Sequence, residues 1–348
     1  MSLPPNVADK LKGFTPYLPS TQKASVLLNT NENFQSPQMD WNAVMRDVKL
    51  NRYPDSKASE CCALAAEYFG VKPEQVVAGN GSDELISLLM MTLMPRNARV
   101  VVTKPDFDMY AFYAGLAEIE IVTSGKRNDL TVDVDALIEQ AQSADLVIFS
   151  TPCNPTGAVV PQADIERILR STDALVVVDE AYADFCGESV LPKLNDYPNL
   201  IVLRTCSKAF GLAGIRLGFA MASEAIITAL HTVRSPFNIN ALTQAVGAEV
   251  LRQPERLKAM IAEILVNKRG FIAAIDAVSH GFKRIDTQTN FILLQGASAQ
   301  ALHTFMAENG IATRFLKPDL LRVTVGSKDE NAAFVRTLSE YQSGGYLM

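Results

Sequence analysis

Between residues 75 and 225 the chain alternates short apolar runs with amphipathic stretches, and this alternation limits the folds it can adopt. The runs "ARVVVT", "DLVIFSTP", "LVVVDEAY" and "LIVLRTCS" each contain three or more consecutive apolar residues, which is typical of strands buried on both faces. The stretches between them, such as "DVDALIEQAQ" and "QADIERILRS", have the spacing of helices with one apolar face. The pattern predicts an α/β fold in which a mostly parallel sheet is flanked by helices.

A different pattern begins near residue 240. Two long helical segments, "ALTQAVGAEVLRQ" and "PERLKAMIAEILVNKRGFIAAIDAV", precede the strand-like runs "NFILLQG" and "LLRVTVG", which lie on either side of the helical segment "AQALHTFMAENG". Because single cores stop growing near about 250–300 residues, a chain of 348 residues is expected to form two lobes. We expect a large domain over residues 41–240 and a smaller α+β domain over residues 241–348, which the N-terminal segment 1–40 joins.

Charge and cysteine content exclude several classes of function. The net charge is −6, so no general affinity for nucleic acid or for an anionic membrane is expected. The five cysteines contain no C-x-x-C pair, and His231, His280 and His303 lack ligand spacing, so neither a disulfide framework nor a metal site is expected. The longest apolar stretch, "LISLLMMTLM", is shorter than the roughly 20 residues of a membrane span, and the first residues contain no signal-peptide core. We expect a cytoplasmic protein whose partners are small molecules or a second copy of itself.

Polar residues follow several predicted strands, at the edge of the sheet where ligands bind in open α/β folds. The segment "GNGSDE" places Gly81, Ser82 and Asp83 at a turn before a helix, where backbone N–H groups can hold a phosphate. An ordinary helix cap explains the same residues. Asn154 in "NPTG" can offer its amide to a ligand or belong to a plain turn. The sequence alone leaves both interpretations of each segment open.

Other strand ends carry groups that are costly to bury alone. Asp179 follows three valines and needs a cation or hydrogen-bond donors, supplied by a ligand, a structural ion pair or a cap. Tyr182, three residues later, can present its phenol to the same cavity. Lys208 lies where the run "LIVLRTCS" gives way to a glycine-rich loop, and Arg216 follows eight residues later. A buried amine in such a place needs a partner.

Together these groups match the needs of pyridoxal 5′-phosphate. Its aldehyde takes a lysine amine, its ring nitrogen stays protonated beside a carboxylate, and its ring oxygen accepts hydrogen bonds. Its phosphate binds a helix start and an arginine. The amine, carboxylate, phenol, amide and arginine occur at strand ends in the order expected of one cavity, so pyridoxal 5′-phosphate is the expected cofactor.

Seven motifs carry a resemblance to a known family: "NTNEN", "RYPD", "GNGSDE", "NPTG", "DEAY", "SKAFGLAGIRLGF" and "LRVTVG". The chain resembles the fold type I pyridoxal-phosphate aminotransferases over essentially its whole length, and is most similar to the histidinol-phosphate aminotransferases. The resemblance implies an enzyme of histidine biosynthesis that converts L-histidinol phosphate and 2-oxoglutarate to imidazole acetol phosphate and glutamate. It also implies a homodimer whose subunits share the active site.

The resemblance further implies a role for each motif residue. The catalytic residues would be Lys208, which forms the Schiff base, Asp179, which pairs with the ring nitrogen, and Tyr182, which contacts the ring oxygen together with Asn154. Tyr110 would stack on the ring, although core packing also explains an aromatic residue at that position. The phosphate would be surrounded by Gly81, Ser82, Asp83, Thr205, Ser207, Arg216 and, from a second subunit, Tyr53.

The resemblance also implies substrate contacts. Arg322 would receive the anionic group of the substrate, which is the phosphate of histidinol phosphate or the carboxylate of glutamate. Tyr17, Asn31 and Arg314 would border the same pocket, or else have solvated or packing roles. The chain departs from the family in having Cys153 where Asn or His is common and in lacking a proline directly after "NEN", so the loop on the substrate side is expected to differ.

Alternatives to this function remain open on the same scaffold. One is an aminotransferase for aromatic or other amino acids, and another is a threonine-phosphate decarboxylase, because the sequence does not show which substrate bond is held perpendicular to the ring. A non-catalytic cofactor-binding regulator is less favoured, since Lys208 is present and the amino terminus is too short for a winged-helix module. A dehydrogenase is poorly supported, because "GNGSDE" lacks the third glycine of a dinucleotide-binding motif.

Overall fold

The large sheet has the architecture that the alternating pattern predicts. In the computed structural model, which describes residues 3–15 and 24–344, seven strands form one sheet in the order β2-β8-β7-β6-β5-β3-β4. Their bounds are β2 Val76–Asn80, β3 Arg99–Lys104, β4 Glu120–Gly125, β5 Leu146–Ser150, β6 Leu175–Asp179, β7 Leu200–Thr205 and β8 Leu217–Ala222. Strand β8 runs antiparallel to both its neighbours, and the remaining pairings are parallel. The prediction of an α/β fold with a mostly parallel sheet is confirmed.

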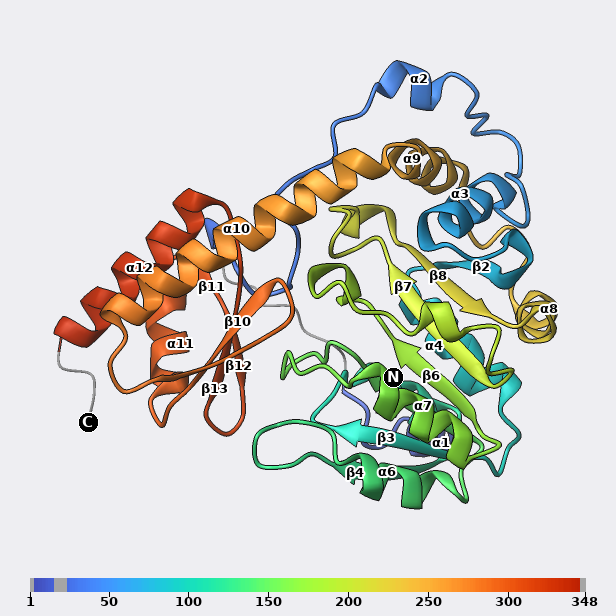
Figure 1. Ribbon diagram of the computed structural model, residues 1–348, viewed down its shortest axis with the longest axis horizontal. Coiled ribbons are helices and arrows are strands. Elements are labelled where there is room, and N and C mark those ends of the chain that lie inside the picture. Colours follow the sequence, from blue (N-terminus) through green and yellow to red (C-terminus); the bar gives the residue numbers. More distant parts are fainter. Residues whose placement is uncertain (1–2, 16–23, 345–348) are drawn as a thin grey trace.

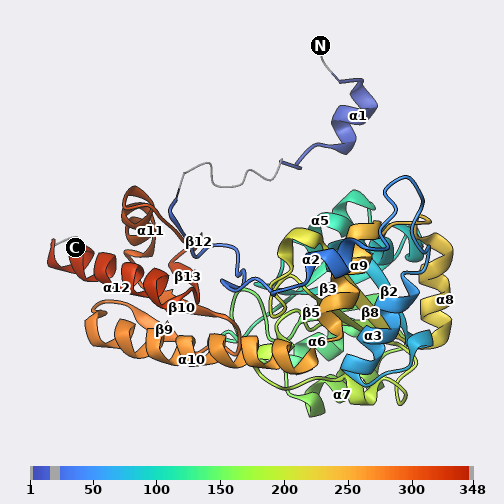
Figure 2. The same ribbon diagram turned by 90° about the horizontal axis from the view of Figure 1, so that it is seen from above.

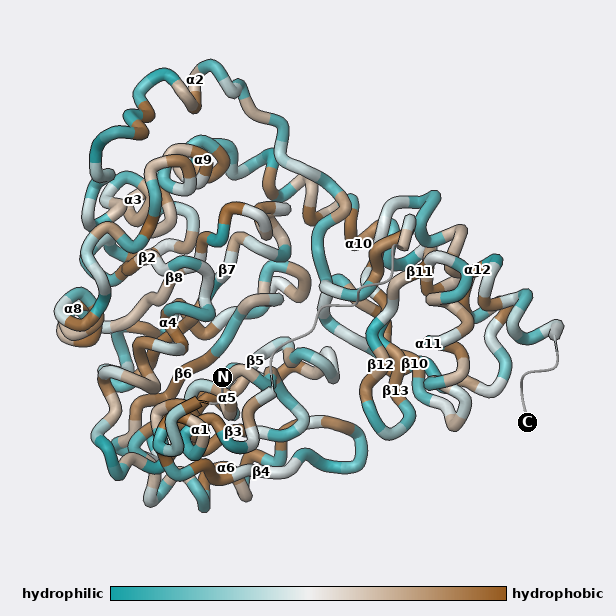
Figure 3. Tube along the Cα trace, turned by 180° about the vertical axis from the view of Figure 1, so that it is seen from behind, coloured by the Kyte–Doolittle hydropathy of each residue, from teal (hydrophilic) through white to brown (hydrophobic). Residues whose placement is uncertain are grey.

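The inner strands of this sheet are largely apolar because their residues contribute to two cores. Successive residues of a strand point to opposite faces, so Val100 and Val102 enter the core on one face and Val101 enters the core on the other. The same division separates Ile148 from Phe149 in β5. Hydrophobic residues therefore follow the strands, whereas the segment around α2 Trp41–Met45 is largely hydrophilic (Figure 3).

Helices cover both faces of the sheet. On one face lie α4 Ser82–Leu88, α5 Met109–Leu116 and α8 Glu224–Val233. On the other face lie α3 Ser59–Phe69, α6 Val134–Ala141, α7 Gln162–Ser171 and α9 Ala241–Leu251. Among the described helices, none combines the length and the apolar composition that a membrane crossing requires.

The smaller lobe is built on a four-stranded antiparallel sheet with the order β12-β13-β10-β9. Its strands are β9 Lys283–Ile285, β10 Phe291–Gln295, β12 Arg314–Leu316 and β13 Leu320–Thr324, and its helices are α10 Pro254–Val278, α11 Ala299–Glu308 and α12 Lys328–Ser343. Seen from above, this lobe lies to one side of the large sheet (Figure 2). Two strands and three helices were predicted after residue 240, and all five form at the expected places.

Two elements join the lobes. Strand β1 Val26–Leu27 pairs in parallel with β11 Ile311–Ala312, so part of the N-terminal segment belongs to the small lobe's structure. The 25-residue helix α10 starts beside α9 and runs along the small lobe to its far side (Figure 1). Domain boundaries at residues 40 and 240 stay a prediction.

The remaining described elements are α1 Pro5–Lys10, η1 Pro73–Gln75, η2 Leu89–Leu93, η3 Ala183–Phe185, η4 Leu191–Lys193 and η5 Ala213–Ile215.

Candidate active site

Most of the predicted site residues lie at the carboxyl ends of the parallel strands. Strands β3, β5, β6 and β7 end at the same edge of the sheet, because they run parallel to one another. The carboxyl end of β3 points toward the small lobe (Figure 1). Side chains from both lobes therefore meet at this edge.

Asp179, the last residue of β6, is held by hydrogen bonds from uncharged donors. Its carboxylate accepts a hydrogen bond from the Tyr110 hydroxyl at 2.7 Å and one from the Ala181 backbone N–H at 3.0 Å. Among the described residues it has no salt-bridge partner, so the structural ion pair considered from the sequence is not found. Burial raises the pKa of Asp179 to about 6, although the hydrogen bonds lower it. The site thus contains a buried acid that a cationic ring nitrogen would satisfy.

Tyr110 is fully buried in α5, with its ring edge-on to Phe107 at 5.6 Å between centroids. Its hydroxyl donates a hydrogen bond to Asp179. Burial is the main cause of the strongly raised pKa of this phenol. Ring stacking by Tyr110 on the cofactor stays a prediction.

Lys208 follows β7 and lies among other cations. Its Nζ donates a hydrogen bond to the Thr30 carbonyl oxygen at 2.8 Å. Burial, together with the nearby guanidinium groups of Arg322 and Arg216, lowers the pKa of Lys208 to about 8, although the carboxylates of Glu32 and Asp83 act in the opposite direction. The Thr30 carbonyl is thus the partner that a buried amine requires.

Arg216 and the start of α4 form the predicted phosphate end of the site. Arg216 donates to the Asp83 carboxylate at 3.0 Å and to the Ser207 hydroxyl at 3.4 Å. Gly81 precedes α4 with a φ of +77°, and a Cβ there would lie 2.7 Å from the Arg216 guanidinium. Glycine is therefore needed at position 81 both for the backbone conformation and for the close approach of the arginine. The residue before the helix, Gly81, has no side chain to cap it, so the first N–H groups of α4 lack the ordinary side-chain cap.

Thr205 and Ser207 are buried beside this end of the site. The Ser207 N–H donates to the Thr205 hydroxyl at 3.1 Å, which leaves the Ser207 hydroxyl oriented toward Arg216. Thr205 and Ser207 therefore lie close to Arg216 and to the start of α4. Together these groups place several hydrogen-bond donors around one position, as a phosphate requires.

Asn154 and Arg322 connect the two lobes. Arg322, on β13, donates to the Asn154 amide oxygen, and its other terminal nitrogen donates to the Asn29 carbonyl at 2.7 Å. Its guanidinium lies 5.5 Å from the centre of the Phe291 ring. The predicted anion-binding arginine therefore reaches the loop that follows β5.

Tyr182 and Asn31 also meet at this edge. The Asn31 side-chain amide donates a hydrogen bond to the Tyr182 hydroxyl at 2.8 Å, and both residues are buried. Burial raises the pKa of the Tyr182 phenol, whereas the charge of Arg322 and the hydrogen bond from Asn31 lower it.

Two further predicted residues, Tyr53 and Arg314, are exposed, and a third lies outside the described residues. Tyr53 is 82% exposed, and its ring stacks on that of Phe237 at 4.6 Å between centroids. Arg314, on β12, is exposed and lies opposite Arg322 in the strand register. Tyr17 lies outside the described residues.

Sequence reasoning missed a buried cluster beneath the site. Asp106 accepts hydrogen bonds from the Ser150 hydroxyl and from the Phe107 N–H, and lies 4.0 Å from the Lys126 ammonium. Lys126 in turn donates to the Cys153 sulfur at 2.7 Å. Asp106 lies two residues after the end of β3, much as Asp179 lies at the end of β6, so its place near a strand end was a signal that could have been used. Lys126 also comes directly after a strand, β4, but it lies far from any motif.

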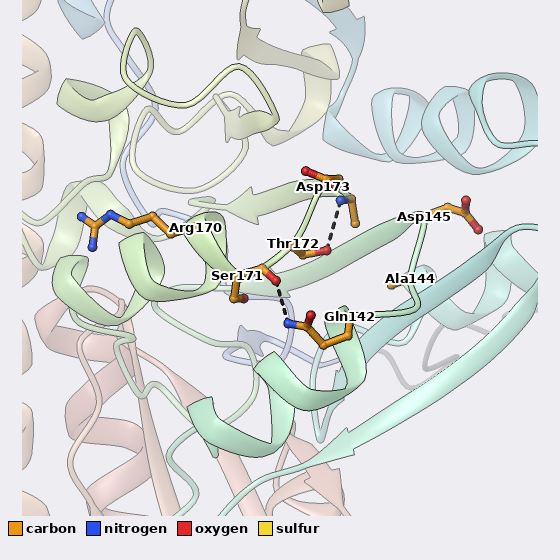
Figure 4. A pocket seen from close by; sticks show the side chains of 8 residues that line it. Gln142, Ala144, Asp145, Arg170, Ser171, Thr172 and Asp173 are labelled. Atoms are coloured by element: carbon orange, nitrogen blue, oxygen red, sulfur yellow. Dashed lines mark hydrogen bonds between the residues drawn. The ribbon is translucent and has the colours of Figure 1, made fainter.

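The surface also has hollows away from this site. One of about 390 Å³ lies where β5 and β6 begin, at the opposite edge of the sheet, and is lined by residues such as Gln142, Asp145 and Thr172. Figure 4 shows the Arg170 and Asp145 side chains pointing away from each other there. No predicted site residue lines this hollow.

Comparison with known proteins identifies related sequences and folds. Residues 24–338 match the model of the family described as aminotransferase class I and II. A histidinol-phosphate aminotransferase of Clostridium kluyveri is 37% identical over 345 residues, which cover 95% of this chain and 97% of the relative. Two solved histidinol-phosphate aminotransferases share the fold. That of Clostridium acetobutylicum has a TM-score of 0.84 at 20% identity, covering 92% of this chain and 99% of the other. That of Sinorhizobium meliloti, solved with pyridoxal-5′-phosphate, has a TM-score of 0.82 at 22% identity, covering 96% and 98%.

Proposed function

This chain belongs to the class I and II aminotransferase family, and from that premise we propose that it transfers the amino group of L-histidinol phosphate to 2-oxoglutarate. It is a pyridoxal-phosphate-dependent aminotransferase. The proposed products are imidazole acetol phosphate and glutamate, which gives the enzyme a place in histidine biosynthesis. The observation that carries this choice of substrate is the identity, over nearly the whole chain, to relatives that bear the name of this activity.

The described residues fit the cofactor. The buried Asp179 lacks a cationic partner, and a cluster of donors formed by Ser207, Arg216 and the start of α4 lies at the other end of the site. We propose that Asp179 holds the ring nitrogen and that this cluster holds the phosphate. Bound pyridoxal phosphate supplies covalent capture of an amino group and withdrawal of electrons into its protonated ring.

Lys208 is the proposed base. With its pKa near 8, about a tenth of its amine is neutral at pH 7, whereas less than about a thousandth of an ordinary lysine amine is neutral there. A neutral Nζ would accept the proton from the substrate α-carbon and hold it for return. The Thr30 carbonyl, which accepts a hydrogen bond from Nζ, keeps the amine at this edge of the sheet.

Asp179 and Tyr110 are proposed to keep the ring nitrogen protonated. A cation beside Asp179 favours the ionised acid, and the ionised acid in turn favours the cation. The Tyr110 hydroxyl donates to one carboxylate oxygen and the Ala181 N–H to the other, which fixes the plane of the carboxylate.

Arg322 is the proposed receptor for the anionic group of either substrate. A guanidinium offers paired N–H donors that suit both a phosphate and a carboxylate, so one arginine can serve the amino donor and the keto acid in turn. Its partners include the neutral oxygens of Asn154 and Asn29, which an anion would replace as the stronger acceptor.

We also propose that two copies of the chain assemble with Tyr53 reaching the phosphate of the other subunit. The support is its position, since an 82% exposed tyrosine stacked on the partly exposed Phe237 offers an aromatic surface to a partner. A cytoplasmic location is proposed from the five cysteines, all of which are unpaired.

The test is a substrate comparison on the purified protein loaded with pyridoxal phosphate. Histidinol phosphate with 2-oxoglutarate should yield glutamate, and the Lys208→Ala variant, as control, should not. Threonine phosphate alone should release no carbon dioxide, and phenylalanine should transfer its amino group far more slowly than histidinol phosphate. Carbon dioxide release, or faster turnover of the aromatic amino acid, would overturn the proposed substrate.

A further inference from the structure

A short strap, residues 29–33, runs between the two lobes and touches the proposed catalytic groups of both. On the large lobe its Thr30 carbonyl accepts from Lys208, and on the small lobe its Asn29 carbonyl accepts from Arg322. Asn31 lies at the centre of the strap and is 1% exposed. Asn31 therefore directly follows the two residues whose carbonyls accept from the amine and from the arginine.

The backbone of Asn31 has a conformation that few residues adopt. Its φ of +56° lies in the left-handed region, which asparagine tolerates better than most residues. The conformation is held from the small lobe, because the Asn31 N–H donates to the Thr324 hydroxyl at 3.0 Å and the Asn290 amide donates to the Asn31 carbonyl at 3.0 Å. The side chain is thereby aimed at the large lobe.

The hydroxyl of Thr324 also decides which way the Asn31 amide points. This hydroxyl accepts the Asn31 N–H, and its single hydrogen is donated to the Asn31 amide oxygen at 3.2 Å. The amide nitrogen must then face the other way, toward Tyr182, to which it donates at 2.8 Å. Thr324 therefore decides that Asn31 donates a hydrogen bond to Tyr182 and does not accept one from it.

The Tyr182 oxygen is an acceptor in this chain, so its own hydrogen must point elsewhere. Among the described residues, no acceptor for that hydrogen is found. We propose that Asn31 is a positioning residue, which holds the Tyr182 phenol as a hydrogen-bond donor to the ring oxygen of pyridoxal phosphate. This assigns Asn31 a role other than bordering the substrate pocket. The proposal depends on the cofactor and on no particular substrate.

The same chain of hydrogen bonds links the phenol to the anion site. Thr324 lies two residues after Arg322 on β13, so the strand that carries the proposed anion receptor also carries the group that orients Asn31. A movement of β13 relative to the large lobe would change both contacts together.

The test is the pH midpoint of the visible absorbance change of the cofactor bound to Lys208, which requires no turnover. A donor to the anionic ring oxygen stabilises the less protonated form, so its loss raises the midpoint. Asn31→Asp places an acceptor opposite the phenol, whose hydrogen then turns away from the cofactor. Loss of a hydrogen bond of this kind predicts an upward shift of about one pH unit.

A double-variant cycle separates this effect from the added negative charge of Asn31→Asp. Tyr182→Phe removes the same donor, so adding it to Asn31→Asp should leave the midpoint unchanged. If the two shifts add, the phenol still donates to the cofactor beside the aspartate, and the proposed role of Asn31 is wrong. The charged or titratable groups that face the phenol, namely Arg322, Asp179 and Cys153, are the same in all these variants.

A second pair of variants covers the case in which Asn31→Asp fails to fold. Thr324→Val removes the hydroxyl that orients the amide and should raise the midpoint, whereas Thr324→Ser, the matched control, keeps the hydroxyl and should not. Equal midpoints for the valine and serine variants would overturn the proposal. Because no substrate is added, a protein that fails with histidinol phosphate but shows these shifts loses only the proposed function.

Discussion

Replacing Asp179 by asparagine should change the stability of the cofactor-free protein in a pH-dependent way. Burial raises the pKa of this acid from 3.8 to about 6, so in the absence of a cation the ionised acid opposes folding. Two pKa units correspond to roughly 3 kcal/mol, at about 1.4 kcal/mol per unit. Because the folded-state pKa is the higher one, this cost is absent below pH 3.8, grows between pH 3.8 and 6, and is constant above that range.

The change in cost between two accessible pH values can be calculated from the same two pKa values. From pH 5 to pH 7.5, the penalty from Asp179 increases by about 1–1.5 kcal/mol. Asparagine does not titrate, so the difference in unfolding free energy between variant and parent should move in favour of the variant by this amount. A constant loss from the weaker contact to Tyr110 or Ala181 appears at both pH values and cancels.

The assay is urea unfolding of the cofactor-free parent and variant at pH 5 and 7.5. Asp196→Asn, which changes a largely exposed carboxylate far from the site, serves as the control. A difference between parent and Asp179→Asn that is the same at both pH values would refute the reasoning, because the acid would then titrate alike in the folded and unfolded chains. With pyridoxal phosphate added, the parent should gain more stability than the variant, since the cation that Asp179 lacks is then present.

Three further predictions concern residues of the site and of the cluster beneath it. Lys208→Ala should retain pyridoxal phosphate through Arg216, as measured by equilibrium dialysis, yet lose the absorbance of the lysine-bound cofactor and nearly all transamination; normal turnover would contradict its role as base. Arg322→Lys keeps the charge but loses the paired donors, so KM for both substrates should rise about ten- to a hundredfold with a smaller change in kcat; an unchanged KM would exclude Arg322 as the anion receptor. Lys126→Met leaves Asp106 buried without its nearest cation and should cost about 3 kcal/mol in urea unfolding, and adding Asp106→Asn should recover much of it; a double variant no more stable than the single one would argue against the ion pair.

Much of the fold could be predicted because local patterns determine it. The valines and isoleucines of β3 and β5 contact both cores, so these strands require runs of consecutive apolar residues, and that feature is visible without a structure. Asp179, Lys208 and Asn154 could be found for a related reason, since a polar group directly after such a run is conspicuous.

The contacts between distant segments could not be predicted in this way. Nothing local to Asn31 indicates that its amide meets Tyr182, because 151 residues separate them and Thr324 decides the orientation from the other side. Lys126 is likewise an ordinary charged residue in the sequence, and only the packed structure brings it to Asp106. Predicting such pairs requires the relative placement of the two lobes and loops, which periodicity does not contain.

The 25-residue helix α10 has a mechanical consequence for the two-lobed site. At 1.5 Å per residue it is a rod of about 37 Å, and a tilt of only about 5° at its α9 end would move the other end by about 3 Å. That displacement is comparable to the length of one hydrogen bond. A lever of this length could engage or release the contact between Arg322 and Asn154 while the cores on either side keep their packing.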